Sequence, residues 1–164
     1  MHRFFTRTNI GIRIDKQQLK EEYKWLMKKY HPDVNKVNPQ IASQITTLYS
    51  TLKRDGPRCK FLLEQKGFFL SDTYVQYKLD NSLLEEFMYI AETIEYTTDK
   101  TELNKLENIL SKEKENYIAK VENLWNNLDY HGCMSIVYHI NYIEKLEDRL
   151  TQKNYELDVK KLEI

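Results

Sequence analysis

Apolar residues recur at helical spacing along most of the chain, and this pattern predicts an all-α protein. In the first such stretch, residues 15–30, apolar side chains share one side of a helix at spacings of four, three and four: Leu19, Tyr23, Leu26 and Tyr30. Asp15 precedes them at the position of an N-cap. A second stretch follows Asn38-Pro39 and predicts a helix that returns antiparallel to the first, with its apolar side formed by Ile41, Ile45, Leu48 and Leu52.

The tripeptide His31-Pro32-Asp33 lies between these two helices. Pro32 has no N–H and pushes the preceding residue out of the α region, so the first helix ends near Tyr30 and His31 begins a loop. Such a tripeptide can also be an ordinary surface turn. The helix before it favours a functional loop because lysines recur on one strip of that helix: Lys16, Lys20, Lys24 and Lys28, with Lys29 beside them.

Three longer amphipathic segments follow and predict an antiparallel three-helix bundle. They span residues 82 to about 96, about 101 to 127, and about 134 to the C-terminus, with His131-Gly132 as the turn before the last one. Gly67 ends the run of residues 61–66 as a C′ glycine ends a helix. We therefore expect a domain boundary between about residues 66 and 80.

Composition and charge agree with a helical protein of two unlike halves. Four glycines and three prolines in 164 residues disfavour a β architecture with many turns, and no apolar run is long enough for a membrane span. Residues 1–60 contain thirteen Lys/Arg and five Asp/Glu, whereas the remaining residues contain twelve and twenty. The basic half leaves open a helical nucleic-acid-binding domain with an acidic tail. An acidic protein partner is favoured, since the lysines concentrate beside the loop.

Other candidate chemistry is weak. His131, Cys133 and His139 match no zinc spacing, and the two cysteines form neither a disulfide framework nor a metal pair, which indicates a reducing compartment. We expect no metal and no cofactor. No nucleophile or oxyanion donor accompanies His31 and Asp33, so an enzyme is not expected.

The N-terminal residues 1–14 are basic and slightly resemble an organellar targeting peptide. Their apolar members are instead expected to pack a first short helix and its connection: Phe4, Phe5, Ile10, Ile12 and Ile14.

These residues resemble the J-domain family, whose hallmark is His-Pro-Asp between two antiparallel helices, the first of them basic. The stretch from Ile45 to Leu63, ITTLYSTLKRDGPRCKFLL, is similar to the HscB type, with its proline-containing turn and an arginine before a Phe-Leu-Leu run. The likeness covers nearly the whole chain. It implies a J-domain in residues 1–68, built of a helical hairpin plus short helices, and an L-shaped arrangement with a three-helix bundle in residues 69–164.

The resemblance also implies what each part binds. The loop residues His31, Pro32 and Asp33 would dock on a DnaK-type chaperone and promote its ATP hydrolysis, together with Lys24, Lys28 and Lys29. An exposed apolar patch on the first and last bundle helices would hold the scaffold protein of iron-sulfur cluster assembly, through Leu83, Leu84, Phe87 and Tyr142. Met88 departs from the family at a commonly acidic position.

Several alternatives stay open. Taken singly, each of the patch residues would more commonly be buried in the bundle core, and the client of a J-protein could be another protein. A structural helical adaptor is a further possibility. A nucleic-acid or membrane partner is not expected. For localisation we expect a mitochondrion or a mitosome-like organelle, with a bacterial cytoplasm as the alternative.

Overall fold

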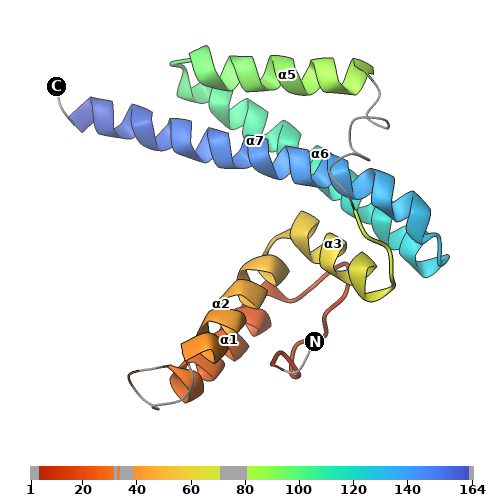
Figure 1. Cartoon of the computed structure of the whole chain (residues 1–164). Helices are drawn as coiled ribbons and strands as arrows, with labels where there is room; N and C mark the ends of the chain where they lie inside the picture. Colours follow the sequence, from red (N-terminus) through yellow and green to blue (C-terminus); the bar gives the residue numbers. More distant parts are fainter. Residues whose placement is uncertain (1–3, 32, 34–38, 71–80, 163–164) are drawn as a thin grey trace. The chain divides into compact units, whose positions relative to one another are not determined.

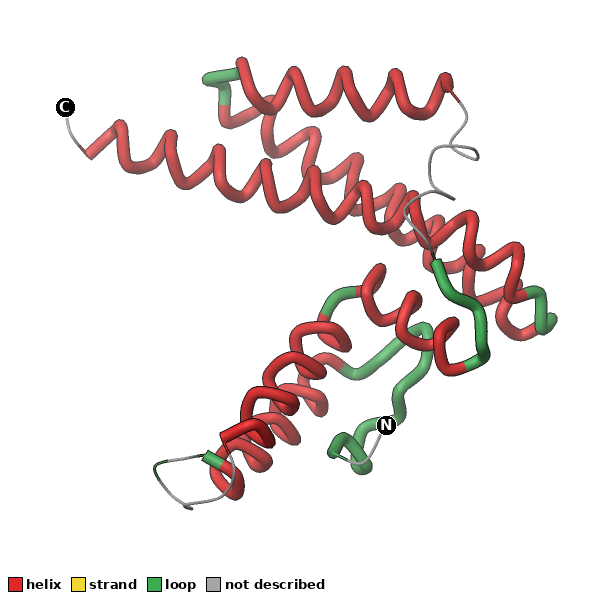
Figure 2. The backbone as a smooth tube through the Cα atoms, viewed as in Figure 1, coloured by secondary structure: helices red, strands yellow, loops and turns green. Residues whose placement is uncertain are grey.

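The computed structural model describes residues 4–31, 33, 39–70 and 81–162, and every regular element in these ranges is an α-helix (Figure 2). The predicted all-α class is confirmed. The chain divides into two compact units, Met1–Gly67 and Phe68–Ile164. Among the described residues, no helix has the length and apolar character needed to cross a membrane.

The first unit is built on a helical hairpin. Helices α1 (Lys16–Tyr30) and α2 (Pro39–Lys53) lie side by side, and α3 (Asp55–Gln65) follows (Figure 1). The rings of Tyr23 and Tyr49 stack with centroids 4.1 Å apart, which links the two arms of the hairpin. Its core contains Phe5, Leu19, Leu26, Ile45 and Leu52. Burial of each such side chain contributes about 1.5–3 kcal/mol.

The predicted start of α1 and the predicted end of α3 are both observed. The Asp15 carboxylate accepts hydrogen bonds from the backbone N–H groups of Gln17 and Gln18, as expected of an N-cap. Gly67 follows α3 with φ +86°, a left-handed conformation that glycine adopts without a Cβ clash.

The segment before α1 is a loop, so the expectation of a first short helix is wrong for residues 4–15 (Figure 2). The buried Glu22 carboxylate on α1 accepts from the backbone N–H groups of Thr6, Arg7 and Thr8 at 2.8, 2.8 and 2.9 Å, and from the Thr8 hydroxyl at 2.6 Å. Three successive N–H groups thus converge on one anion, a concave backbone arrangement. Phe5 nevertheless packs in the core, as expected.

A buried arginine binds the C-terminal end of this loop. The Arg58 guanidinium is 1% exposed and donates to the carbonyl oxygens of Ile12 at 2.7 Å and Leu52 at 3.0 Å. It also forms an ion pair with Asp55 at 2.6 Å. Loop, α2 and α3 therefore meet on one side chain.

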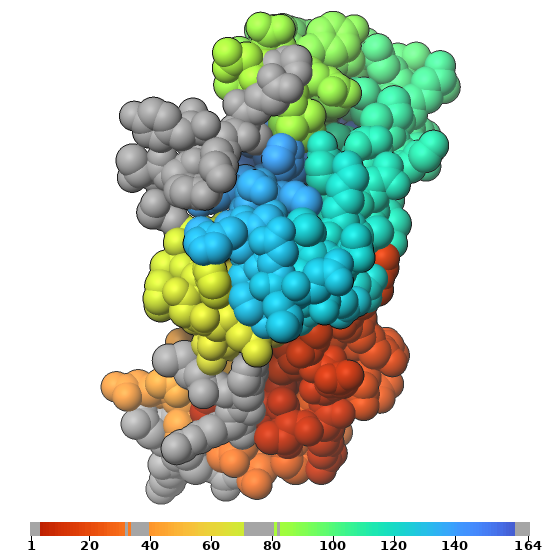
Figure 3. Space-filling model, turned by 90° about the vertical axis from the view of Figure 1, so that its right-hand side faces the viewer, coloured from red at the N-terminus to blue at the C-terminus, as the bar shows by residue number. Residues whose placement is uncertain are grey.

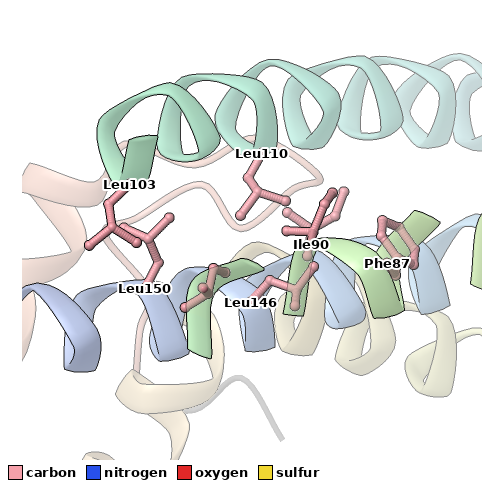
Figure 4. Close-up of a cluster of buried hydrophobic side chains, with 8 residues drawn as sticks. Phe87, Ile90, Leu103, Leu110, Leu146 and Leu150 are labelled. Atoms are coloured by element: carbon pink, nitrogen blue, oxygen red, sulfur yellow. The ribbon is translucent and has the colours of Figure 1, made fainter. Parts of the chain in front are cut away.

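The second unit is the predicted three-helix bundle, made of α5 (Asn81–Tyr96), α6 (Lys100–Asn126) and α7 (Tyr130–Leu162). Helices α6 and α7 lie side by side, and their surfaces adjoin in Figure 3. Figure 4 shows that side chains from all three helices meet in one core, including Phe87, Ile90, Leu103, Leu110, Leu146 and Leu150.

The last helix begins earlier than its pattern predicted. It starts at Tyr130, so the expectation that His131-Gly132 forms the turn is wrong. Leu128, with φ 61°, reverses the chain, and the Asp129 carboxylate then accepts from the Gly132 N–H at 2.8 Å. This capping bond places Gly132 inside the first turn of α7.

Candidate functional site

The described part of the His-Pro-Asp loop presents two polar side chains at the surface. His31 caps α1, since its N–H donates to the Met27 carbonyl at 2.9 Å while its own backbone is extended. The side chains of His31 and Asp33 are 44% and 88% exposed. Pro32 lies outside the described residues.

These two residues contact each other. The Asp33 N–H donates to His31 Nδ1 at 3.3 Å, and an Asp33 carboxylate oxygen lies 3.5 Å from the same nitrogen. When Nδ1 accepts this hydrogen bond, the proton of a neutral imidazole is on Nε2. The ring then offers an N–H donor, and Asp33 a carboxylate, to a partner.

The predicted lysine face is exposed on α1. Lys24, Lys28 and Lys29 are all exposed, and the Lys29 ammonium lies 5.3 Å from the ring centroids of both Trp25 and Tyr30. Lys16, at the far end of α1, pairs with Asp55 at 3.1 Å. The cations beside the loop are therefore those of the last two turns of α1.

The second predicted site lies in the bundle, and its residues differ in exposure. Leu83, Leu84 and Tyr142 are half-buried, whereas Phe87 is only 4% exposed and stacks on Tyr142 with ring centroids 4.8 Å apart. Leu83 packs against the same core. The expectation of a surface position for Phe87 is therefore wrong, because its side of α5 faces α7.

An outer stripe on α5, not among the residues predicted from the sequence, continues the exposed side of this site. Leu84, Met88, Ala91 and Glu95 follow at spacings of four, three and four, so they share one side of the helix. Met88 is 52% exposed. The helical spacing is visible in the sequence, but Met88 stands at a position that is commonly acidic in the HscB type, so it gave no signal for the site.

The outer stripe ends at a pocket between α5 and α7. The pocket has a volume of about 500 Å³ and is lined by Ala91 and Ile94 together with charged residues that include Glu95, Asp148 and Arg149. An apolar floor with a charged rim suits a protein segment that carries both kinds of side chain.

Two of the candidate metal residues, Cys133 and His139, make contacts within the helical bundle. Cys133 is buried, its thiol lies 3.6 Å from the Val121 carbonyl, and burial raises its pKa to about 11. His139 Nδ1 lies 2.9 Å from the Ser135 carbonyl, and burial lowers the pKa of this imidazole. Among the described residues, no group of three or more His, Cys, Asp or Glu side chains could hold a metal ion.

The bundle matches a known family. A family model described as the HSCB C-terminal oligomerisation domain matches residues 79–151. A protein named co-chaperone protein HscB from Buchnera aphidicola is 26% identical over 161 residues, with 91% of each chain covered. The co-chaperone protein HscB of Proteus mirabilis is 29% identical over 151 residues, with 84% of this chain and 86% of the relative covered.

The fold of the whole chain also has a solved counterpart. The crystal structure of the human co-chaperone protein HscB matches with a TM-score of 0.78 and 19% identity, and covers 93% of this chain and 81% of that one. Both curated relatives above are bacterial proteins, so they give no support to the expected mitochondrial localisation.

Proposed function

Because this chain belongs to the HscB-type co-chaperones, we propose that it stimulates the ATPase of a DnaK-type chaperone and delivers to it the scaffold protein on which iron-sulfur clusters are built. The observation that carries this proposal is the exposed pair His31 and Asp33, held in contact at the end of a lysine-rich helix. Residues 1–68 would act as the J-domain, and residues 69–164 would bind the scaffold protein.

At the chaperone end, we expect charge to bring the partners together and the loop to act after contact. Lys24, Lys28 and Lys29 attract an acidic surface and raise the association rate. His31 and Asp33 then meet the partner in a conformation that their mutual contact already favours, which lowers the entropic cost of binding. The ATP is hydrolysed in the partner's own site, so this chain need supply no catalytic residue.

At the scaffold end, we expect the apolar residues of the outer stripe of α5 and the edge of the bundle core to form one surface. Leu83 and Leu84 are half-buried, so part of each side chain is accessible to a partner. The buried Phe87 holds Tyr142 in place by stacking on its ring. A few residues commonly provide most of the free energy at a protein interface, and Tyr142 is of a type enriched among them.

The first test separates the two ends. His31→Gln keeps the size and polarity of the side chain but removes the imidazole, and should abolish ATPase stimulation of the DnaK-type chaperone. Scaffold affinity, measured by calorimetry on the same protein, should be unchanged. Loss of both properties to the same extent would contradict a two-ended adaptor.

The second test concerns the scaffold surface. The double variant Leu83→Ala and Leu84→Ala should weaken scaffold binding by about 2 kcal/mol, or roughly thirtyfold. ATPase stimulation measured without the scaffold protein should be unchanged. Ile109→Ala is the matched control, because Ile109 is an exposed aliphatic residue on α6. Circular dichroism would verify that all variants are folded. An affinity equal to that of the control would remove this surface from the proposal.

A further inference from the structure

Trp25 is a large aromatic residue at the surface of α1, and two cations flank it. Its side chain is 41% exposed, the Arg7 guanidinium lies 4.2 Å from the centre of its ring, and the Lys29 ammonium lies 5.3 Å away. A cation at such a distance is attracted by the negative face of the ring. An exposed ring beside two cations presents apolar surface and positive charge at one place.

The N-terminal loop holds Arg7 in this position. The Arg7 N–H donates to the Glu22 carboxylate at 2.8 Å, and the Arg7 carbonyl accepts from the Gln18 side-chain amide at 3.0 Å. Both backbone polar groups of Arg7 are thus bonded to α1. Glu22 is one turn away from Trp25, so the contact that positions the loop also places the guanidinium over the ring.

Distance and charge relate this surface to the His-Pro-Asp loop. Trp25 precedes His31 by six residues, or about 9 Å along a helix that rises 1.5 Å per residue. An interface of standard size buries about 800 Å² on each partner, enough to include both residues. Residues 1–67 contain fourteen Lys/Arg and six Asp/Glu, so a partner of acidic character fits this unit best.

We propose that Trp25, flanked by Arg7 and Lys29, anchors the surface that docks on the DnaK-type chaperone, and that the N-terminal loop contributes to docking through Arg7. This inference rests on the proposed function and adds a residue that sets affinity for the partner. Trp and Arg are among the residue types enriched where the binding energy of an interface concentrates. On the partner we expect a carboxylate beside an apolar surface.

The test measures ATPase stimulation of a purified DnaK-type chaperone from the same organism against co-chaperone concentration. Trp25→Ala should raise the half-maximal concentration by roughly tenfold or more while maximal stimulation is retained. Arg7→Ala should raise it by a smaller factor. Tyr155→Ala, which removes an exposed aromatic residue from α7, is the control and should change neither quantity.

A residue that anchors docking sets the half-maximal concentration, whereas a loop that acts after docking sets the maximal stimulation. His31→Gln should abolish maximal stimulation, which is the prediction of the proposed function itself. If His31→Gln abolishes stimulation while Trp25→Ala and Arg7→Ala leave the half-maximal concentration unchanged, the anchor is overturned and the proposed function stands. Stimulation that survives His31→Gln would contradict the proposed function.

Circular dichroism of each variant separates a loss of docking from a loss of folding. If Trp25→Ala does not fold, Arg7→Ala tests the inference.

A nucleic acid could also stack on an exposed ring beside cations. Binding of a single-stranded oligonucleotide that Trp25→Ala weakens, with unchanged half-maximal chaperone concentration, would assign this surface to nucleic acid and overturn the inference.

Discussion

Glu22 and Arg58 are charged residues inside the first unit, and both act on the same segment of chain. Glu22 binds the backbone of Thr6, Arg7 and Thr8, and Arg58 binds the carbonyl of Ile12. Removing one partner from a buried ion pair such as Arg58–Asp55 commonly costs about 3–5 kcal/mol because the other charge is left unpaired. These two side chains therefore substitute for a helix as the means of fixing the N-terminal segment.

The Glu22 contact predicts an acid-sensitive first unit. Burial by itself would raise the pKa of Glu22, but hydrogen bonds from the Thr8 hydroxyl and three backbone N–H groups lower it below the ordinary 4.5. The unfolded chain then binds more protons than the folded one as pH falls below the ordinary value. The stability that Glu22 contributes is complete above that value and is lost as pH falls through the lowered folded pKa.

The variant Glu22→Gln tests whether Glu22 is the source of this acid sensitivity. The amide cannot accept the same hydrogen bonds as a carboxylate, so we expect the variant to be about 2–4 kcal/mol less stable at pH 7 and less sensitive to acid. Urea unfolding can be followed by Trp25 fluorescence in a Trp125→Phe background, where Trp25 is the one remaining tryptophan. Parallel stability curves for both proteins between pH 7 and pH 3 would exclude Glu22 as the source.

At the scale of single elements, the end of α3 depends on the backbone conformation of Gly67. Its φ of +86° disfavours any residue with a Cβ, and an added Cβ would meet no atom within 4 Å. Gly67→Ala should therefore destabilise the first unit by about 1 kcal/mol through backbone strain alone. Urea unfolding measures this, and a variant as stable as the original protein would show that the turn relaxes without cost.

Elements fixed by nearby residues were predictable, whereas those fixed by distant ones were not. The ends of α1 follow from Asp15 and Pro32, both at the helix ends themselves. The N-terminal loop depends on Glu22, at least 14 residues away, so no local pattern reveals it. Gly132 resembles a turn residue in the sequence, but the turn follows from Leu128 and the Asp129 cap.

The same distinction applies to the candidate site. His31 and Asp33 were identified because their signal is a contiguous tripeptide beside a helix end. The burial of Phe87 depends on Tyr142, which belongs to another helix. The sequence of α5 shows which residues share a side, but not which side α7 covers.

For the whole molecule, charge separates the two proposed binding functions. Residues 1–67 have eight more basic than acidic residues, and residues 68–164 have eight more acidic than basic ones. Attraction between exposed charges is screened within about 10 Å at 0.1 M salt, while burial of apolar surface is not weakened by moderate salt. The two partners should therefore respond differently to ionic strength.

Raising NaCl from about 0.05 to about 0.5 M should increase the half-maximal concentration for ATPase stimulation by roughly tenfold, because docking depends on lysines of α1. Scaffold affinity, which we assign to apolar residues of α5 and α7, should change by less than about threefold. Lys24→Gln with Lys28→Gln should reduce the salt dependence of stimulation and leave that of scaffold binding unchanged. Equal salt dependence at both ends would show that charge does not distinguish the two interfaces, and the scaffold surface would then have to include the acidic residues around the pocket between α5 and α7.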